Sequence, residues 1–284
     1  MSGILYVVGT PIGNLGDLSP RAVEVLESVD FIAAEDTRVT LKLLNHFQIK
    51  KNMISYFEHN KRERGEIICQ RIENGENCAI VTDAGMPCIS DPGEELVKQC
   101  AEKGIKTVVV PGPSAVISAL AVSGLSTGRF TFEGFLSTNK KSRLDHLEQL
   151  KTEKRTMIFY EAPHKLSSTL NDLFKAFGDR KISIVREITK IHEEVIRTTL
   201  QKAAEDYADG SLKGEIVLVL EGAPEDIDKI EYTLDDAVKL AKKFLEDGYP
   251  VSESAKQAAK TTGFRKNEIY KLIKQNTILE CQFK

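Results

Sequence analysis

The residue whose type and position most favour ligand chemistry is Asp83, in the stretch AIVTDAGMPCISDPG that starts at Ala79. The apolar run Ala79–Val81 predicts a short buried strand, and Asp83 stands where that strand ends. Four glycines and prolines between Gly85 and Gly93 disfavour a regular helix or strand and let the backbone approach a ligand closely. Because ligands bind at the carboxyl edge of an open parallel sheet, we expect Asp83 to stand at a binding edge.

Two further stretches repeat this pattern of an apolar strand followed by a loop with glycine and proline. Ile4–Val8 precedes GTPIGN, and Thr107–Val110 precedes PGPSA. Three such units indicate one shared small-molecule site at the edge of a sheet. The alternative is that they are three ordinary connections between strands and helices.

The loop Gly9–Gly16 superficially matches a dinucleotide-binding fingerprint, because three glycines follow a strand. Their spacing departs from the fingerprint, however, and Pro11 falls between the first two. Ser19 and Pro20 predict that the next helix begins only there, as its N-cap and first residue. A pyrophosphate held by the glycines would miss the helix N-terminus that should stabilise it, so the pattern argues against NAD.

Charged clusters at other predicted strand ends are candidate substrate contacts. Asp36, Thr37 and Arg38 follow the strand Phe31–Ala34, and they either cap the helix Val39–His46 or form a substrate-binding loop. Basic side chains on loops suit phosphates, and neighbouring aromatic side chains suit stacked bases. The other candidates of this kind are Lys140, Lys141, Arg143, His164 and Arg186, together with the run Lys61–Arg64 next to Tyr56 and Phe57.

The composition is that of an ordinary globular protein, with 284 residues, 41% hydrophobic and 29% charged. A net charge of only −3 means that any nucleic-acid surface must be local. The five cysteines form no CxxC pair, which argues against a disulfide scaffold and a zinc site, and lone histidines argue against other metals. No apolar run reaches the ~18 residues of a membrane span. We expect a soluble, reduced, cytoplasmic protein.

The length suggests two domains with an appendage. The small, polar stretch Gly124–Gly128 predicts a boundary between α/β domains at 1–124 and 125–224. An acidic linker, Glu225–Ile230, precedes a helical module at 231–284, in which Ser252 is a candidate N-cap. Between Ser252 and Lys274 the module has six basic and two acidic residues and resembles a helix-turn-helix, so it is either a solvated cap or an RNA contact.

Seven stretches, in order along the chain, resemble the tetrapyrrole methylase superfamily. The resemblance is greatest to its branch of small-subunit ribosomal RNA 2′-O-ribose methyltransferases I. The stretches are LYVVGTPIGNLGDLSPRA from Leu5, AAEDTR from Ala33, TDAGMPCISDPG from Thr82, VVPGPSA from Val109, YEAPHK from Tyr160, REITKIHEE from Arg186 and GEIVLVLEG from Gly214. Such an ordered series is far more specific than one glycine motif.

The resemblance implies two α/β domains with S-adenosylmethionine in the cleft between them, a small C-terminal helical module and a homodimer. The implied product is a 2′-O-methyl group on a cytidine in the decoding region of 16S rRNA, within the small ribosomal subunit. The implied cofactor residues are Thr10, Pro11, Asp83, Ala84, Gly85, Pro111, Gly112, Pro113, Ser114, Ala115, Tyr160, Gly214 and Glu215. Lys165 stands where arginine is expected more often, which keeps a cation but loses bidentate phosphate binding.

Methyl transfer from a sulfonium needs no metal, so much of the enzyme's task is positioning. A ribose hydroxyl is weakly acidic and needs a base, or a cation that stabilises the forming alkoxide. We hypothesise that Lys165 or Lys190 lowers the pKa of the hydroxyl, while Glu187 or Asp83 orients it or accepts the proton. The sequence does not choose among these four catalytic candidates.

Two other functions remain open. A carbon methylase acting on a tetrapyrrole would share the fold, but the loop TPIGN from Thr10 departs from the loop typical of those enzymes. The AEDTR cluster and the basic helical module would also have no role. A nucleic-acid-binding regulator with a ligand-sensing α/β core would need base-reading side chains, and Lys266–Lys274 has few of them.

Overall fold

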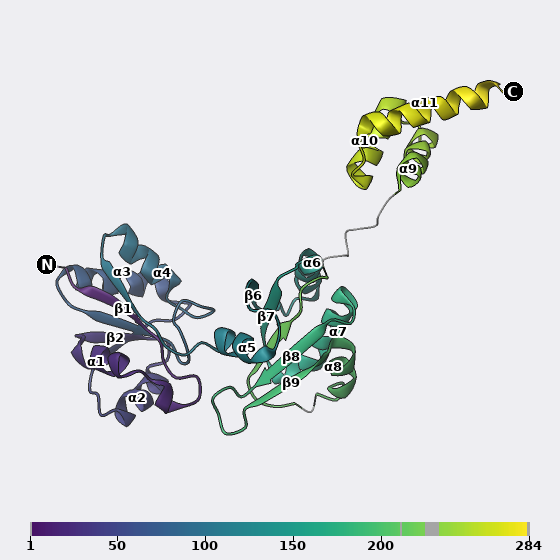
Figure 1. Cartoon of the computed structure of the whole chain (residues 1–284). Helices are drawn as coiled ribbons and strands as arrows, with labels where there is room; N and C mark the ends of the chain where they lie inside the picture. The colour runs from purple at the N-terminus through teal and green to yellow at the C-terminus, as the bar shows by residue number, and fades with distance from the viewer. Residues whose placement is uncertain (1, 211, 225–232, 283–284) are drawn as a thin grey trace. The chain divides into compact units, whose positions relative to one another are not determined.

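The computed structural model describes residues 2–210, 212–224 and 233–282, and the acidic stretch 225–230 lies outside them (Figure 1). The chain forms two compact units, Met1–Ala223 and Pro224–Lys284. The first unit holds two five-stranded sheets, and the second holds helices. Within the described residues, no helix has both the length and the apolar character needed to cross a membrane.

The first sheet is entirely parallel, with the order β3-β2-β4-β1-β5. Its strands are β1 (Ile4–Val8), β2 (Phe31–Ala34), β3 (Asn52–Ser55), β4 (Cys78–Val81) and β5 (Lys106–Val110). The central strands β2 and β4 are buried at every position, as their unbroken apolar sequences predict. Because neighbouring strands are parallel, the loops after β1, β4 and β5 meet at one edge, as we expected.

The helices of this half are α1 (Pro20–Ser28), α2 (Thr37–His46), α3 (Lys61–Glu73) and α4 (Glu94–Glu102), with a 3-10 turn, η1, at Leu15–Asp17. Ser19 caps α1 by accepting a hydrogen bond from the N–H of Ala22, and Pro20 is the first helical residue, as predicted. The run Lys61–Arg64, which we expected on a loop, forms the first turn of α3 instead. Its lysine, arginine and glutamate side chains favour helix. Tyr56 is also no RNA contact, because it is 1% exposed.

The second sheet is mixed, with the order β6-β7-β10-β8-β9. Its strands are β6 (Phe130–Phe135), β7 (Thr156–Glu161), β8 (Lys181–Arg186), β9 (Glu194–Thr199) and β10 (Ile216–Leu220). Only the pair β6–β7 is parallel. One face of this sheet is covered by α6 (Lys140–Leu150), α7 (Leu166–Phe177) and α8 (Leu200–Asp206). Their side chains Leu147, Leu170 and Leu200 form a core with the buried side chains on that face.

The other face of the second sheet is covered by α5 (Ala115–Ser123), which lies between the two sheets in Figure 1. Val116, Ala119 and Leu120 of α5 pack against Ile158 and Val217 of that sheet. Although α5 falls inside the first predicted domain, 1–124, its buried face belongs to the second sheet. In its packing, α5 therefore belongs to the second half, and the boundary between the two α/β halves lies before Ala115 rather than after residue 124.

The second unit contains α9 (Leu234–Glu246), α10 (Val251–Thr262) and α11 (Lys266–Gln282). Four alanines, Ala237, Ala241, Ala255 and Ala258, form its core together with Val238, Ile269 and Ile273. Gly263, with φ +77°, ends α10 in the left-handed conformation, where the turn was predicted. The predicted N-cap is wrong, because Pro250 occupies that position and Ser252 already lies inside α10.

Candidate active site

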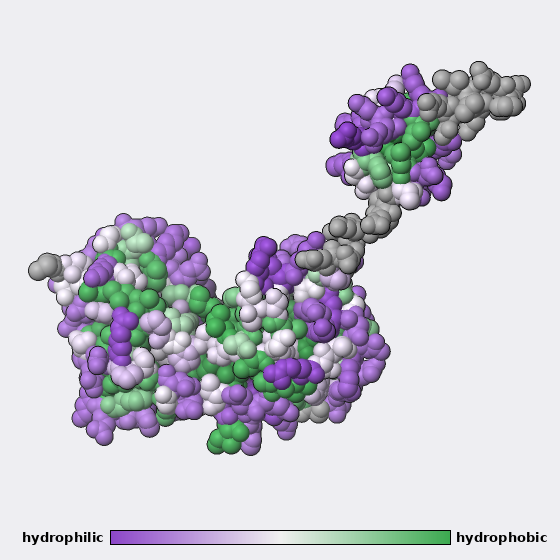
Figure 2. All heavy atoms as spheres, in the orientation of Figure 1, coloured by the Kyte–Doolittle hydropathy of each residue, from purple (hydrophilic) through white to green (hydrophobic). Residues whose placement is uncertain are grey.

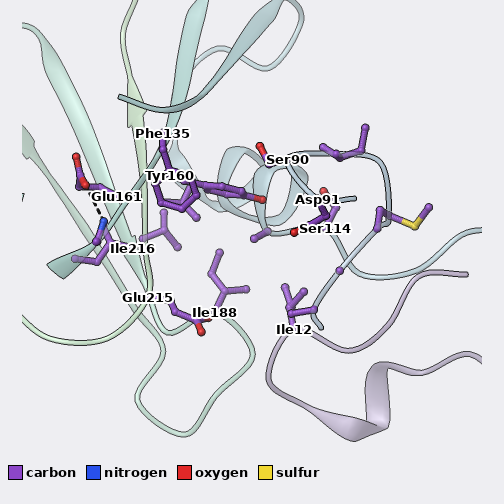
Figure 3. A pocket seen from close by; sticks show the side chains of 18 of the residues that line it. Ile12, Ser90, Asp91, Ser114, Phe135, Tyr160, Glu161, Ile188, Glu215 and Ile216 are labelled. Atoms are coloured by element: carbon purple, nitrogen blue, oxygen red, sulfur yellow. Dashed lines mark hydrogen bonds between the residues drawn. The ribbon is translucent and has the colours of Figure 1, made fainter. Parts of the chain in front are cut away.

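A cavity of about 430 Å³ lies in the first unit and is lined by residues of both α/β halves (Figure 3). This volume is in the range of pockets that hold a small molecule. Six of the implied cofactor residues line it: Ala84, Gly85, Ser114, Ala115, Tyr160 and Glu215. These six come from the loops after β4 and β5 in the first half and from two segments of the second half.

The other implied cofactor residues stand beside the cavity rather than in its wall. Thr10 is 1% exposed, and its hydroxyl donates a hydrogen bond of 3.0 Å to the carbonyl of Thr82. The backbones of Thr10 and Gly85 also exchange two hydrogen bonds, of 2.9 and 3.1 Å. Thr10 therefore holds the loops after β1 and β4 together. Pro11, Asp83, Pro111, Gly112, Pro113 and Gly214 are not among the lining residues.

Glycines allow the loops after β1 and β5 to touch. A Cβ atom on Gly9 would lie 2.7 Å from the Cα of Gly112 and 2.6 Å from the Sδ of Met86. Because the first of these neighbours is backbone, it has little freedom to move away. The absence of side chains at Gly9 and Gly112 is therefore a condition for the loop arrangement around the cavity.

Asp83 belongs to a network that links the ends of β2 and β4. Its Oδ1 accepts a hydrogen bond of 3.1 Å from the N–H of Asp36, while Glu35 accepts hydrogen bonds from the Thr82 hydroxyl and the N–H of Asp83. Partial burial and the nearby carboxylates of Glu35 and Asp36 raise the pKa of Asp83. The structure therefore gives Asp83 a role in holding two loops together.

The cluster of Asp36, Thr37 and Arg38 forms the start of α2. Asp36 caps the helix by accepting a hydrogen bond of 2.8 Å from the N–H of Arg38, whose guanidinium also pairs with it. These hydrogen bonds lower the pKa of Asp36 to about 2. The capping alternative is thus observed, and Arg38, with an 87% exposed side chain, still faces solvent.

Two catalytic candidates, Lys190 and Glu187, form one cluster with Glu215. The ammonium of Lys190 lies 2.9 Å from Glu187 and 3.0 Å from Glu215, which lines the cavity. Although burial opposes it, hydrogen bonds to these carboxylates raise the pKa of Lys190. The backbone N–H of Glu215 and the ammonium of Lys190 lower the pKa of Glu187. Lys190 and Glu187 are therefore both charged at neutral pH.

This cluster also connects the two halves of the unit. A Cβ atom on Gly13 would lie 2.5 Å from Cγ of Lys190, so the aliphatic part of Lys190 packs against the loop after β1. Gly214 leaves room for Glu187 in the same way, since a Cβ there would lie 2.6 Å from Cγ of Glu187. Gly214, implied as a cofactor residue, thus makes space for a catalytic candidate.

The remaining candidates are not among the residues that line the cavity. Lys165 and His164 form the 3-10 turn η2 (Pro163–Lys165), whose Pro163 lines the cavity. Within the described residues, the ammonium of Lys165 has no hydrogen bond or ion pair. Arg186 pairs with Glu194 at 2.9 Å, and Arg143 with Asp172 at 2.8 Å. Lys140 and Lys141 are exposed in the first turn of α6.

Asp91 is the cavity carboxylate that the sequence reasoning missed. It lines the cavity with Ser90, and Figure 3 shows Asp91, Ser114 and the Tyr160 hydroxyl directed toward one another. Burial, and then the charge of Glu35, raise the pKa of Asp91 to about 6. Its place in the same glycine- and proline-rich loop as Asp83 was a signal that could have identified it. Within the described residues, no cluster of His, Cys, Asp and Glu is arranged to hold a metal ion.

Comparison with known proteins identifies the class to which this fold and cavity belong. Residues 4–204 match the family of tetrapyrrole (corrin/porphyrin) methylases. The fold is also similar to that of a uroporphyrin-III-C-methyltransferase from Thermus thermophilus, with a TM-score of 0.55, 18% identity and coverage of 77% of this chain and 94% of that one. A diphthine synthase gives a TM-score of 0.58 at 13% identity, covering 78% and 90%.

Curated relatives narrow the class to one branch. A ribosomal RNA small subunit methyltransferase I from Synechocystis is 47% identical, covering 95% of this chain and 97% of the relative. Proteins of the same name from Halalkalibacterium halodurans and Bacillus subtilis are 44% and 42% identical, covering 96% and 94% of this chain and 95% and 93% of the relatives. The chain belongs to the tetrapyrrole methylase family and, within it, to the ribosomal RNA small subunit methyltransferase I branch.

The chain is accordingly a methyltransferase, and its cofactor is S-adenosylmethionine. The cavity fits this group chemically. Its lining combines apolar side chains such as Ile12 and Val217 with the hydroxyl of Ser114 and the carboxylate of Asp91. A half-buried carboxylate close to Glu35 and Asp83 favours a cationic ligand, and a sulfonium is one.

Proposed function

We propose that this chain methylates the ribose 2′-hydroxyl of a cytidine in the decoding region of 16S rRNA, acting on the small ribosomal subunit. The observation that carries the proposal is a cofactor-sized cavity in a chain with near-full-length similarity to ribosomal RNA small subunit methyltransferases I. The proposal also gives a role to basic side chains outside the cavity, among them Lys140, Lys141 and those of α10 and α11.

A carbon methylase acting on a tetrapyrrole is the second candidate, favoured by the structural similarity to a uroporphyrin-III-C-methyltransferase. That similarity is at 18% identity and concerns the fold, whereas the relatives that modify ribosomal RNA reach 47% identity over nearly the whole chain. The tetrapyrrole reaction would also leave the exposed basic residues of the second unit without a function. We therefore prefer ribosomal RNA as the substrate.

Bound S-adenosylmethionine supplies an activated methyl group, so the protein's own side chains must position and activate the hydroxyl. Lys190 is the candidate that the geometry favours for stabilising the forming alkoxide, because Glu187 and Glu215 hold its ammonium charged at the cavity. Glu187 orients Lys190 and already accepts two hydrogen bonds, from Lys190 and the N–H of Glu215. Lys165, whose ammonium is free among the described residues, is the candidate for binding an RNA phosphate.

Substitution of the four catalytic candidates separates these roles. In single-turnover methyl transfer, Lys190→Met should lower the rate by about 10²–10³-fold, the usual effect of removing one oxyanion-stabilising donor. Lys165→Met should mainly raise the RNA concentration needed for half-maximal rate. Asp83→Asn and Glu187→Gln test the two carboxylates as proton acceptors. Unchanged rates in all four variants would refute the assignment of catalysis to these residues.

We also propose that the chain works as a cytoplasmic homodimer. Support comes from apolar side chains left exposed on β5 and α5, namely Val109 (52%), Ile117 (53%) and Val122 (39%). The strand β5 lies at the edge of its sheet, and Figure 2 shows apolar atoms gathered where α5 lies. A second copy of the chain could cover these side chains.

The function is tested with small ribosomal subunits from cells that lack this protein. The purified chain is incubated with these subunits and labelled S-adenosylmethionine, and the RNA is digested to nucleosides. Label in 2′-O-methylcytidine, or in its base-methylated form, is the expected result. Tight cofactor binding without label would favour the tetrapyrrole reaction, and loss of cofactor binding would contradict the assignment of the cavity.

A further inference from the structure

A β-bulge in β6 turns an aromatic side chain into the cavity. The pairing of β6 with β7 shifts between Phe132 and Gly134, and Gly134 has φ +65°. In a regular strand, Phe132 and Phe135 would point to opposite faces of the sheet. The extra residue puts both on the face of Tyr160, so Phe135 lines the cavity. Bulges of this kind often re-aim a side chain next to an active site.

Phe135 is exposed although it belongs to an aromatic cluster. Its ring centroid lies 5.4 Å from that of Tyr160, and Phe132 lies 5.0 Å from Tyr160 on the same face. Tyr160 and Phe132 are partly buried against the α5 core, whereas Phe135 remains 60% exposed. Figure 3 shows Phe135 next to Tyr160 in the cavity wall. The cluster therefore holds one ring in place while leaving much of its surface open.

The loop after β4 brings a second apolar side chain to the same cavity. Ile89 lines the cavity and is 50% exposed, and its neighbours Cys88 and Ser90 have φ values of +73° and +61°. Such left-handed residues other than glycine are uncommon and often mark functional loops. A Cβ on Gly134 would lie 3.7 Å from Oγ of Ser90, so this loop reaches the bulge. The two halves thus contribute one exposed apolar side chain each.

We propose that Phe135 is the platform on which the base of the target nucleotide stacks, with Ile89 as a further apolar contact. The inference rests on the proposed function, because it assumes an RNA substrate. A ribose can reach a cavity only if its nucleotide leaves the stack, and unstacked bases are commonly received by aromatic side chains. A ring that is more than half exposed suits a base carried in by a polymer better than a buried small-molecule cofactor.

The test compares Phe135→Ala with Phe130→Ala, both in the full chain. Phe130 is a matched control, because it lies on the same strand, is 36% exposed and does not line the cavity. Methyl transfer to small subunits is measured against subunit concentration at saturating S-adenosylmethionine, and cofactor affinity is measured by calorimetry. Phe135→Ala should raise the KM for subunits by about 5- to 150-fold, the range of alanine substitutions at stacking positions.

Two further variants and three contradicting outcomes complete the test. Phe135→Trp should restore the KM, while Phe135→Leu, which keeps apolar bulk without a ring, should not. Equal KM values for Phe135→Ala and Phe130→Ala would overturn the inference, and so would weaker cofactor binding with an unchanged KM for subunits. A wild-type chain that binds the cofactor but methylates no subunit would instead overturn the proposed function, and the inference with it.

Discussion

The carboxylate of Asp91 gives the cavity a charge that depends on pH. Burial, the charge of Glu35 and, less, the charge of Asp83 favour its neutral form, whereas a hydrogen bond from the Thr82 hydroxyl favours the ionised form. With a pKa of about 6, Asp91 changes from mostly neutral to mostly ionised between pH 5 and pH 7. A cation in the cavity would be attracted only by the ionised form.

The affinity for S-adenosylmethionine should therefore rise with pH through this range. Because a carboxyl group loses its proton as pH rises, the gain between pH 5 and pH 7 should approach about tenfold, the ratio of the two ionised fractions. Calorimetric titration at several pH values measures it. Asp91→Asn should bind more weakly at pH 7 and show a much flatter profile. An unchanged slope in this variant would assign the titration to another group.

At the residue scale, the sequence pointed to strand-end loops rich in glycine and proline as the place of the cofactor residues. Six implied cofactor residues do line the cavity, because strand-end motifs mark the edge of a parallel sheet. Sequence reasoning did not reveal which residues of such a loop face the cavity. Asp83 and Asp91 occur in one loop, yet of the two only Asp91 lines the cavity, while the carboxylate of Asp83 accepts a hydrogen bond from the N–H of Asp36.

At the scale of elements, the glycines between the loops after β1 and β5 should be irreplaceable. Gly9→Ala places a Cβ 2.7 Å from the Cα of Gly112, and such overpacking typically costs about 1–3 kcal/mol. We expect a lower Tm and weaker cofactor binding. Gly128→Ala is the control, since its Cβ would meet nothing within 4 Å and its φ is not positive. Similar Tm values for the two variants would show that the loops move apart at little cost.

The sequence predicted the strands and helices themselves better than it predicted which of the two α/β halves each element packs in. The apolar residues of α5 predict a buried face, which is formed by Val116, Ala119 and Leu120. The periodicity of these residues does not reveal which sheet that face covers. The bulge in β6 was likewise hidden, because simple alternation places Phe135 on the face opposite Phe130 and Phe132, and only the register with β7 shows otherwise. Tertiary contacts decide both features.

At the scale of the whole molecule, the exposed apolar residues of β5 and α5 predict association of two chains. Ile117→Asp should place a charge in that contact, which is costly without a partner, and should shift the protein toward monomers. Light scattering during gel filtration measures the mass. Leu41→Asp, at a 47% exposed position of α2, is the matched control and should leave the mass unchanged. A monomeric wild-type chain would refute the dimer.

The second unit should contribute affinity for RNA without taking part in the reaction. Lys260 and Lys266 are exposed on α10 and α11, and each phosphate contact adds roughly one unit to the slope of log affinity against log salt. Changing both to Gln should weaken binding to small subunits and reduce this slope by about two units, while cofactor affinity and Tm stay constant. Lys98 and Lys106, exposed in the first unit, provide a control with the same loss of charge. Equal salt slopes for the two double variants would show that net charge alone acts, and that the helical unit makes no specific contact with RNA.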